Sequence, residues 1–180
     1  MIFATVGTQL PFDRLLISLN EWAKRHSGYP IFAQTGPSTL VFDHLEAARN
    51  LGQADFQERV TSARLIVAHA GIGTILSAAE LAKPIIVMPR RKVLGEHRSN
   101  HQIDTAEKLK HLGNVTIAQD EAALWRAINH AIAQDFCCEP AEGVSAFSRR
   151  NALIQTVRDF TLGASTTVPT PLTLEPQVAK

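Results

Sequence analysis

The sequence is poor in cysteine and has no long apolar segment. Its 180 residues include two cysteines, Cys137 and Cys138, and because adjacent cysteines rarely bridge one another we expect reduced thiols. No run of about 18 apolar residues occurs, so no transmembrane helix is predicted. The N-terminus lacks a basic stretch followed by a long apolar run, so no signal peptide is predicted. We therefore expect a cytoplasmic protein that contacts a membrane only peripherally or through a partner.

The charge is balanced, and common signatures of metal and covalent catalysis are absent. Lysine and arginine total 18 against 17 aspartate and glutamate, a formal net charge of +1, so we expect no nucleic-acid partner. The motifs HExxH, CxxC, DxD and GxSxG do not occur. Their absence argues against zinc and serine hydrolase chemistry, and it favours metal-independent chemistry without a cofactor.

What the sequence does contain is an alternation of short apolar runs and helix-like segments. The apolar runs are continuous, as expected for strands of a parallel sheet that are covered on both faces. Predicted strands cover 2–6, 30–36, 65–70, 85–89 and 115–118, with 39–43 as a further candidate. Predicted helices cover 11–26, 54–63, 73–82, 97–112 and 121–134, the last capped by Asp120. The pattern predicts an α/β fold with a mostly parallel sheet.

The pattern weakens beyond residue 139. One more helix is predicted over 144–161, and the segment 163–180 is rich in proline, threonine and serine, which predicts a disordered tail. A hydrophobic content of 45% over this chain length suits a single domain, which we place at 1–162.

Two glycines lie between the predicted strand 65–70 and the helix that follows it. In an open parallel sheet, ligands bind beyond the carboxyl ends of the strands, where the first amides of a helix suit a phosphate. Gly71 and Gly73 would let such a ligand approach the backbone, although tight packing of strand against helix would explain them equally well. The segment is neither a Walker A loop nor GxGxxG, since Leu76 stands at the third glycine position.

A polar stripe runs along the same helix. Thr74, Ser77 and Glu80 are spaced by three among apolar residues, so they share one helix face. A carboxylate on this stripe would accept hydrogen bonds from two ribose hydroxyls while the start of the helix holds phosphate. The alternative is that the stripe simply faces solvent.

The segment 89–102 is a second candidate for binding an anion. It concentrates Arg90, Arg91, Lys92 and Arg98 directly after a predicted strand, which suits a diphosphate or a sugar acid, or else forms a solvated basic loop. Its two histidines are four residues apart, but no further ligands accompany them, and we expect no metal site.

Three segments taken together resemble one known family. They are TVGTQLPFDRL (5–15), AHAGIGTILSAAELAKPIIVMPR (68–90) and GEHRSNHQ (95–102). In order, over about residues 2–135, they resemble the glycosyltransferase family 28 C-terminal domain, and in particular its small stand-alone members. The resemblance implies a Rossmann-like domain, the C-terminal half of a GT-B fold, which binds a UDP-sugar. The other half would be a separate, membrane-associated subunit.

The resemblance also implies roles for the glycine-rich segments. It assigns Gly71, Gly73 and Thr74 to the diphosphate of the donor. It assigns Glu80 to the ribose. The pair 7–8, Gly-Thr, would form a first glycine loop that faces the phosphates and the acceptor.

The His-Gln pair of the third segment would contact the donor sugar. Bacterial members usually have Asn-Asp just before this pair, where this chain has Ser99 and Asn100, so one carboxylate is missing. The complete expected donor-binding set is Gly7, Thr8, Gln9, His69, Gly71, Ile72, Gly73, Thr74, Glu80, Arg90, Arg91, His97, His101 and Gln102.

The family resemblance implies an inverting glycosyltransferase subunit that works with its partner. The basic loop favours UDP-glucuronic acid as donor, with UDP-galactose, UDP-glucose and UDP-N-acetylglucosamine as alternatives. The acceptor would be a polyprenyl-diphosphate-linked saccharide in exopolysaccharide or capsule synthesis, at the inner face of the membrane. No catalytic base is identifiable, and we expect it on the partner. The helix 144–161 would dock against that partner or else form a simple lid.

Two other interpretations remain at this point. A non-catalytic enhancer of a partner glycosyltransferase would not need the glycine loop or the His-Gln pair. A free-standing enzyme acting on a sugar nucleotide, such as an epimerase, would be expected to have a second domain.

Overall fold

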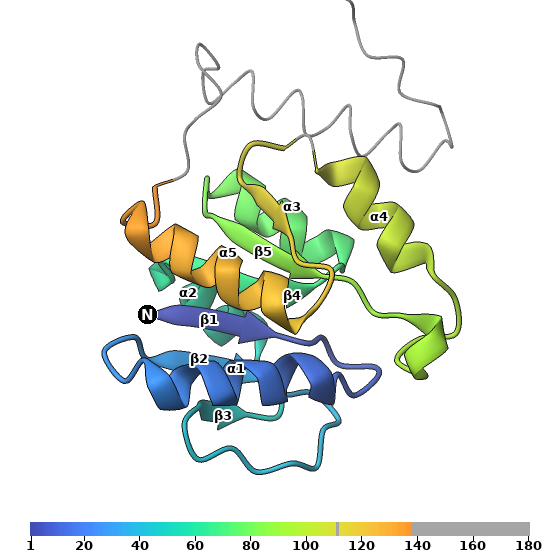
Figure 1. Cartoon of the computed structure of the whole chain (residues 1–180), viewed down its shortest axis with the longest axis horizontal. Helices are drawn as coiled ribbons and strands as arrows, with labels where there is room; N and C mark the ends of the chain where they lie inside the picture. The colour runs from blue at the N-terminus through green and yellow to red at the C-terminus, as the bar shows by residue number, and fades with distance from the viewer. Residues whose placement is uncertain (111, 138–180) are drawn as a thin grey trace, which may run out of the picture.

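Six parallel strands form one sheet between two layers of helices in the computed structural model, which describes residues 1–110 and 112–137 (Figure 1). The strands are β1 (Ile2–Thr5), β2 (Ile31–Gln34), β3 (Glu46–Ala48), β4 (Leu65–His69), β5 (Ile85–Met88) and β6 (Val115–Ile117). The helices are α1 (Asp13–Arg25), α2 (Gln53–Ser62), α3 (Ile72–Glu80), α4 (His101–Leu109) and α5 (Glu121–Ala133), with a 3-10 turn η1 (Lys92–Leu94).

The strand order reverses direction at the centre of the sheet. The order is β3-β2-β1-β4-β5-β6, and every neighbouring pair is parallel. Ala4 of β1 lies between Ala33 of β2 and Val67 of β4. The chain first builds outward from β1 to β3 and then returns to add β4 beside β1. This is the arrangement in which a crevice opens beyond the carboxyl ends of the two central strands.

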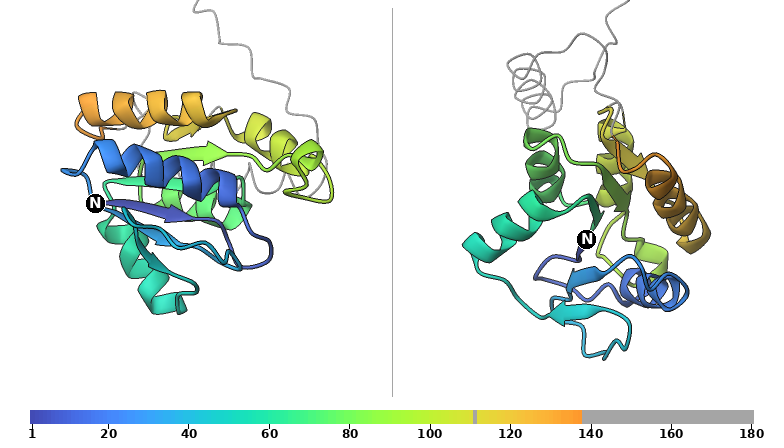
Figure 2. Two further views of the ribbon diagram at one scale, coloured as in Figure 1. Left: turned by 60° about the horizontal axis from the view of Figure 1, so that its bottom comes forward. Right: turned by 90° about the vertical axis from the view of Figure 1, so that its left-hand side faces the viewer.

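Alternate residues of each strand point into different halves of the core. Ile2 and Ala4 pack toward α1 and α5, whereas Phe3 packs on the opposite face with α2, α3 and α4. The right-hand view of Figure 2 shows α1 and α5 on one side of the sheet and α2 and α3 on the other. Because both faces are covered, the strands read as continuous apolar runs, and this confirms the predicted α/β fold.

The segment 39–43 is not a strand, and that prediction was wrong. Leu40 and Val41 are 43% and 90% exposed, and the third strand is instead Glu46–Ala48. A strand parallel to β2 can begin only after the chain has returned along the sheet, and residues 37–45 make that return without a helix.

The helix predicted over 97–112 begins later, at His101. The preceding residues form a loop because their side chains bind backbone amides: Glu96 accepts from Arg91 N, and Asn100 accepts from Lys92 N. The predicted cap of α5 is confirmed, since the Asp120 carboxylate accepts from Ala123 N at 2.7 Å.

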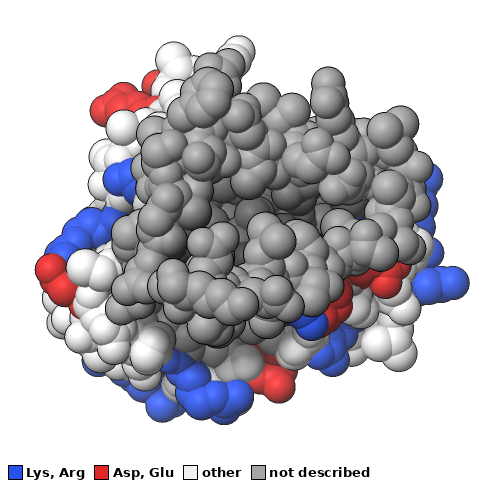
Figure 3. Space-filling view, turned by 90° about the horizontal axis from the view of Figure 1, so that it is seen from above, with Lys and Arg blue, Asp and Glu red and all other residues white. Residues whose placement is uncertain are grey.

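Two predictions lie outside the described residues, namely the helix 144–161 and the tail 163–180. No helix among the described residues has the length and apolar character needed to cross a bilayer. Where described residues are visible in Figure 3, basic and acidic side chains are interspersed, in keeping with the balanced charge.

Candidate functional site

A cavity of about 680 Å³ opens at the carboxyl ends of β1 and β4, where the strand order reverses. Three connections form it: the one after β1, the one after β4, and the one between β5 and α4. Its lining is Val6, Gly7, Thr8, Gln9, Leu10, His69, Ala70, Gly71, Ile72, Gly73, Thr74, Arg90, His97, His101, Gln102 and Thr105. All but two of the residues expected from the sequence therefore surround one cavity.

The start of α3 presents free backbone amides to this cavity. Gly71 is the N-cap residue and has no side chain with which to cap the helix, and its own amide donates to the His69 carbonyl at 2.7 Å. The amides of Ile72, Gly73 and Thr74 belong to the first helical turn, which has no intrahelical acceptors, and no other acceptor is found for them within the described chain. Partly positive amides at a helix N-terminus form a site suited to an anion.

The two glycines of this loop differ in their surroundings. A Cβ atom at Gly71 would lie 2.4 Å from Nε2 of His69, so a side chain at residue 71 would require the imidazole to shift. A Cβ atom at Gly73 would meet no atom within 4 Å, and the backbone there is ordinary helix. Packing therefore explains Gly71 alone, and the absence of a side chain at Gly73 leaves open space toward the cavity.

The loop after β1 also approaches the imidazole of His69. Gly7 has a positive φ of 78°, and a Cβ there would lie 3.0 Å from Cε1 of His69. Gly36 also has a positive φ, and its Cβ would lie 2.3 Å from the Gly7 carbonyl oxygen. Both positions need glycine for backbone conformation and for close approach. Both glycine loops thus lie close to the His69 ring.

His69 is uncharged at neutral pH. Burial, together with the nearby positive charge of Arg90, lowers the pKa of His69 from 6.5 to about 4. Its Nδ1 atom is buried without a hydrogen-bond partner among the described residues. A group with this pKa is a poor match for general-base chemistry near neutral pH.

Arg90 is a structural residue of the cavity wall. Its guanidinium donates to the carbonyls of Val6 and Leu10 at 2.8 and 2.6 Å and also to those of Pro11 and Glu96. The residue is 2% exposed, and burial lowers the pKa of Arg90 to about 10, which leaves it protonated at neutral pH. The residue lines the cavity, and its N–H groups hold the loop after β1 in place.

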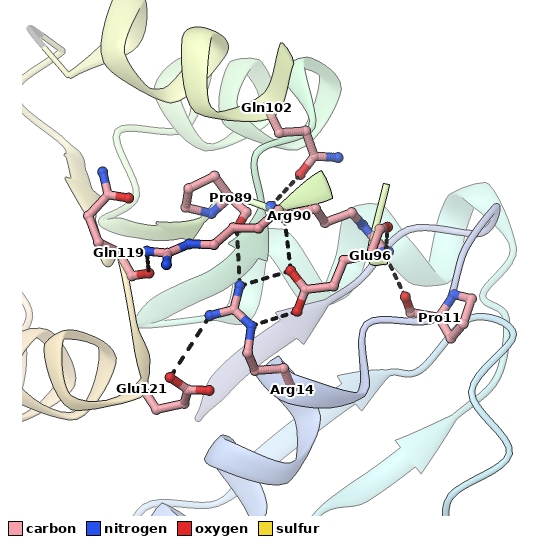
Figure 4. Close-up of polar contacts among 9 residues, drawn as sticks. Pro11, Arg14, Pro89, Arg90, Glu96, Gln102, Gln119 and Glu121 are labelled. Carbon is pink, nitrogen blue, oxygen red and sulfur yellow. Dashed lines mark hydrogen bonds and ion pairs between the residues drawn. The ribbon is translucent and has the colours of Figure 1, made fainter. Parts of the chain in front are cut away.

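An ion pair that the sequence analysis missed fixes the basic loop (Figure 4). Arg14 of α1 donates to both carboxylate oxygens of Glu96, at 2.6 and 3.0 Å. Glu96 also accepts from the amide of Arg91, whose guanidinium in turn donates to the Gln119 carbonyl. The partners are 82 positions apart, and nothing local in the sequence indicates that they meet.

The start of α4 completes the cavity. The rings of His97 and His101 pack edge to face with centroids 4.4 Å apart, although His97 lies in the loop before the helix. Gln102 is buried, and its side-chain oxygen Oε1 accepts a hydrogen bond from the backbone amide of Arg90 at 3.1 Å. Among the described residues, no group of three or more His, Cys, Asp or Glu is placed to hold a metal ion.

Two residues of the expected set do not line the cavity. Glu80 is the exposed last residue of α3, two turns beyond Gly73. Arg91 lies behind the cavity wall, on the Gln119 carbonyl. Of the polar stripe, only Thr74 reaches the cavity.

Comparison with known proteins places this geometry in context. Residues 1–141 match the glycosyltransferase family 28 C-terminal domain. UDP-N-acetylglucosamine transferase subunit ALG13 of Yarrowia lipolytica (strain CLIB 122 / E 150) is 24% identical over 136 residues, which cover 67% of this chain. This chain spans 65% of that relative, less than two thirds of its length.

Solved structures share the fold. The NMR structure of ALG13 superposes with a TM-score of 0.58 at 20% identity, covering 87% of this chain and 96% of that one. The crystal structure of Acinetobacter baumannii MurG gives a TM-score of 0.53 at 19% identity, covering 89% of this chain and 49% of that one. The sheet and its helices thus correspond to about half of the MurG chain and to nearly the whole of the ALG13 chain.

Proposed function

Because the chain belongs to the glycosyltransferase family 28 C-terminal domain family, and its Rossmann-like fold is that of the C-terminal half of a GT-B protein, we propose that it is the donor-binding subunit of a two-component glycosyltransferase. The donor is a UDP-sugar, bound in the cavity at the carboxyl ends of β1 and β4. The partner is a membrane-associated subunit that supplies the other half of the active site.

Gly73 carries this proposal. The chain places a glycine where its own packing does not need one, beside amides that have no acceptor among the described residues. A diphosphate against the start of α3 would account for both features, because it needs close backbone approach and N–H donors. Gly7 and Thr8 would face the same phosphates from the opposite loop, since they line the same cavity.

The remaining donor groups are assigned by position. His97, His101 and Gln102 would contact the sugar, because they line the wall contributed by α4 and the loop before it. Glu80 is the proposed ribose contact, and this requires the nucleoside to extend along α3 past Ser77, since Glu80 lies outside the cavity lining. Replacement of Glu80 by alanine should then weaken UDP binding in calorimetry, and an unchanged affinity would remove the ribose assignment.

The proposed reaction is transfer with inversion. The acceptor hydroxyl attacks the anomeric carbon, a new carbon–oxygen bond forms, and the bond to the diphosphate breaks with its electron pair leaving on UDP. The free amides of α3 stabilise the charge that develops on the leaving group. The acceptor proton passes to a base on the partner subunit, since His69 is too weakly basic for this role.

The transferred sugar and the acceptor are the remaining parts of the proposal. UDP-glucuronic acid was favoured by the basic loop, but Arg90 and Arg91 use their guanidinium groups on backbone carbonyls. UDP-galactose, UDP-glucose and UDP-N-acetylglucosamine therefore enter the test on equal terms. A polyprenyl-diphosphate-linked saccharide at the cytoplasmic face of the membrane is the proposed acceptor, as in exopolysaccharide or capsule synthesis.

Calorimetry with UDP on the full chain tests the donor site directly. Gly73→Ala should leave the fold intact and lower UDP affinity about tenfold or more, because the added methyl group occupies the path of the diphosphate. A variant that binds UDP as the wild type does would overturn the assignment of Gly73.

A second experiment tests the transferase itself. The chain is co-expressed with the product of the neighbouring gene and assayed with a panel of UDP-sugars and a polyprenyl-diphosphate-sugar acceptor. Transfer that needs both chains supports the proposal. Full turnover by the partner alone would instead make this chain a non-catalytic enhancer.

A further inference from the structure

The η1 turn holds two aliphatic side chains out in solvent beside the cavity. Val93 is 84% exposed and Leu94 is 53% exposed. The turn projects beyond the carboxyl end of the sheet, below α4 in Figure 1 and at the far right of the left-hand view of Figure 2. His97, a short distance along the chain, lines the cavity. The exposed pair thus belongs to the connection between β5 and α4 that forms one wall of the proposed donor site.

The turn is held in this position by its own hydrogen bonds. The amides of Leu94 and Gly95 donate to the carbonyls of Arg91 and Lys92 at 3.2 and 3.0 Å, and Gly95 closes the turn with a positive φ of 71°. The amide of Lys92 donates to the Asn100 side chain. These bonds satisfy the amides of Lys92, Leu94 and Gly95, which lowers the cost of moving the turn into a less polar environment.

The charges around the pair have one sign. The carboxylate of Glu96 is neutralised by Arg14, to which it makes two hydrogen bonds. Lys92 and Arg98 are exposed, and neither forms an ion pair within the described chain. Two exposed aliphatic groups flanked by cations without an ion-pair partner among the described residues match the chemistry of an anionic lipid surface, where the apolar groups enter the interface and the cations bind phosphates.

We propose that the η1 turn, residues 92–94, together with Arg98, binds the headgroup layer of an anionic lipid bilayer directly. This surface is additional to the donor site and does not depend on it, because the proposed function leaves membrane attachment to the partner subunit. It would hold the mouth of the cavity at the membrane surface without the partner.

A second exposed aliphatic pair provides a matched control. Leu40 and Val41 are 43% and 90% exposed, like Val93 and Leu94, but the adjacent charged residue is Asp43 instead of a cation. An anionic lipid surface would repel the carboxylate of Asp43. Hydrophobic exposure alone predicts equal membrane binding by the two pairs, whereas the proposal predicts binding through Val93 and Leu94 only.

Co-sedimentation of the full chain with lipid vesicles tests the proposal. Wild-type protein should sediment with vesicles of phosphatidylcholine and phosphatidylserine, less so at high salt, and not with phosphatidylcholine alone. V93S/L94S should bind about tenfold more weakly, and L40S/V41S should bind like the wild type. K92Q/R98Q should lose about fivefold in affinity per charge removed. Thermal unfolding checks that each variant is folded.

Three results would overturn the proposal. The first is absence of wild-type binding to anionic vesicles, and the second is wild-type binding by V93S/L94S. The third is a V93S/L94S variant that still binds vesicles but no longer captures the co-expressed partner, which would make the turn a protein interface. UDP calorimetry on the same samples separates the lipid-binding proposal from the donor-site proposal. A variant that loses lipid binding but still binds UDP would leave the donor-site proposal unaffected.

Discussion

The imidazole of His69 occupies the space in which a side chain at position 71 would lie. Gly71 and Gly7 both lie against the Nε2–Cε1 edge of the ring, where a Cβ atom would come within 2.4 and 3.0 Å of it. This contact joins the two glycine loops of the cavity through one buried, neutral side chain. It also separates a glycine that the fold requires from Gly73, which the fold does not.

Substitution of the two glycines should have opposite effects on stability. Gly71→Ala should lower the free energy of unfolding by about 1–3 kcal/mol, because the added methyl group overlaps His69. Gly73→Ala should leave it unchanged or raise it by about 0.4–1 kcal/mol, because the residue is helical and unhindered. Urea unfolding followed by circular dichroism measures both. Equal destabilisation by the two variants would contradict the packing described for His69.

The free energy of unfolding should decrease as the pH is lowered through the range in which the unfolded chain gains a proton at His69. The folded pKa of His69 is about 4 and the unfolded value is 6.5, so between these values the unfolded state binds more protons. The stabilisation is complete above pH 6.5 and is lost progressively as the pH falls toward 4. The difference amounts to about 3 kcal/mol.

Denaturant unfolding at several pH values tests this linkage. His69→Gln should flatten the dependence between pH 6.5 and 4. His44, which is exposed, provides the control, and His44→Gln should keep the wild-type slope. An unchanged slope in the His69 variant would assign the pH dependence to other groups.

The pair formed by Arg14 and Glu96 should contribute more to stability than an exposed pair. The two side chains are 15% and 10% exposed, and their contact is bidentate. Glu96→Gln should cost about 2 kcal/mol, because it removes charge-assisted hydrogen bonds from a largely buried site. A double-mutant cycle with Arg14 measures the coupling energy between the two residues.

The exposed pair Lys110–Glu107 is the reference for that cycle. Its side chains are 64% and 47% exposed, and a pair of this kind on a helix contributes about 0.2–0.5 kcal/mol. The coupling energy of Arg14 with Glu96 should exceed this value clearly. Similar coupling in the two pairs would mean that the basic loop is not fixed by Glu96.

Arg90→Lys should disturb the donor cavity although it preserves the charge. A lysine ammonium cannot reproduce the planar fork that binds Val6, Leu10 and Pro11 together, so buried carbonyls would lose their donors. We expect a loss of about 2 kcal/mol in the free energy of unfolding and weaker UDP binding. Arg98→Lys, at an exposed position, is the control for stability. Wild-type stability in Arg90→Lys would show that these hydrogen bonds are dispensable.

Most elements of the fold were predictable because their signals are local. Continuous apolar runs such as 65–70 are typical of strands covered on both faces, and Asp120 caps its helix through a contact three residues away. The errors arose where distant groups decide. Leu40 and Val41 look like part of a strand, but they lie on the return path between parallel strands. The residues before α4 are not helical because the side chains of Glu96 and Asn100 accept hydrogen bonds from backbone amides several residues away.

The candidate site followed the same division. The glycine loops and the His-Gln pair were recognisable because each is a short motif of consecutive or nearby residues in the sequence. Their meeting around one cavity follows from the strand order, since the carboxyl ends of β1 and β4 are neighbours. The roles of the arginines were not predictable. A basic residue in a loop suggests an anion, whereas Arg90 in its folded surroundings binds carbonyls.

By itself the sequence determined the alternation of strands and helices, the glycine loops and the family. These depend on hydrophobic periodicity and on conformational preferences that act over a few residues. Only the tertiary structure decided which glycine serves packing, that Glu96 pairs with Arg14, and that Val93 and Leu94 remain exposed. Each of those outcomes depends on which surfaces meet when distant segments pack, and burial and hydrogen-bond satisfaction are properties of the assembled fold.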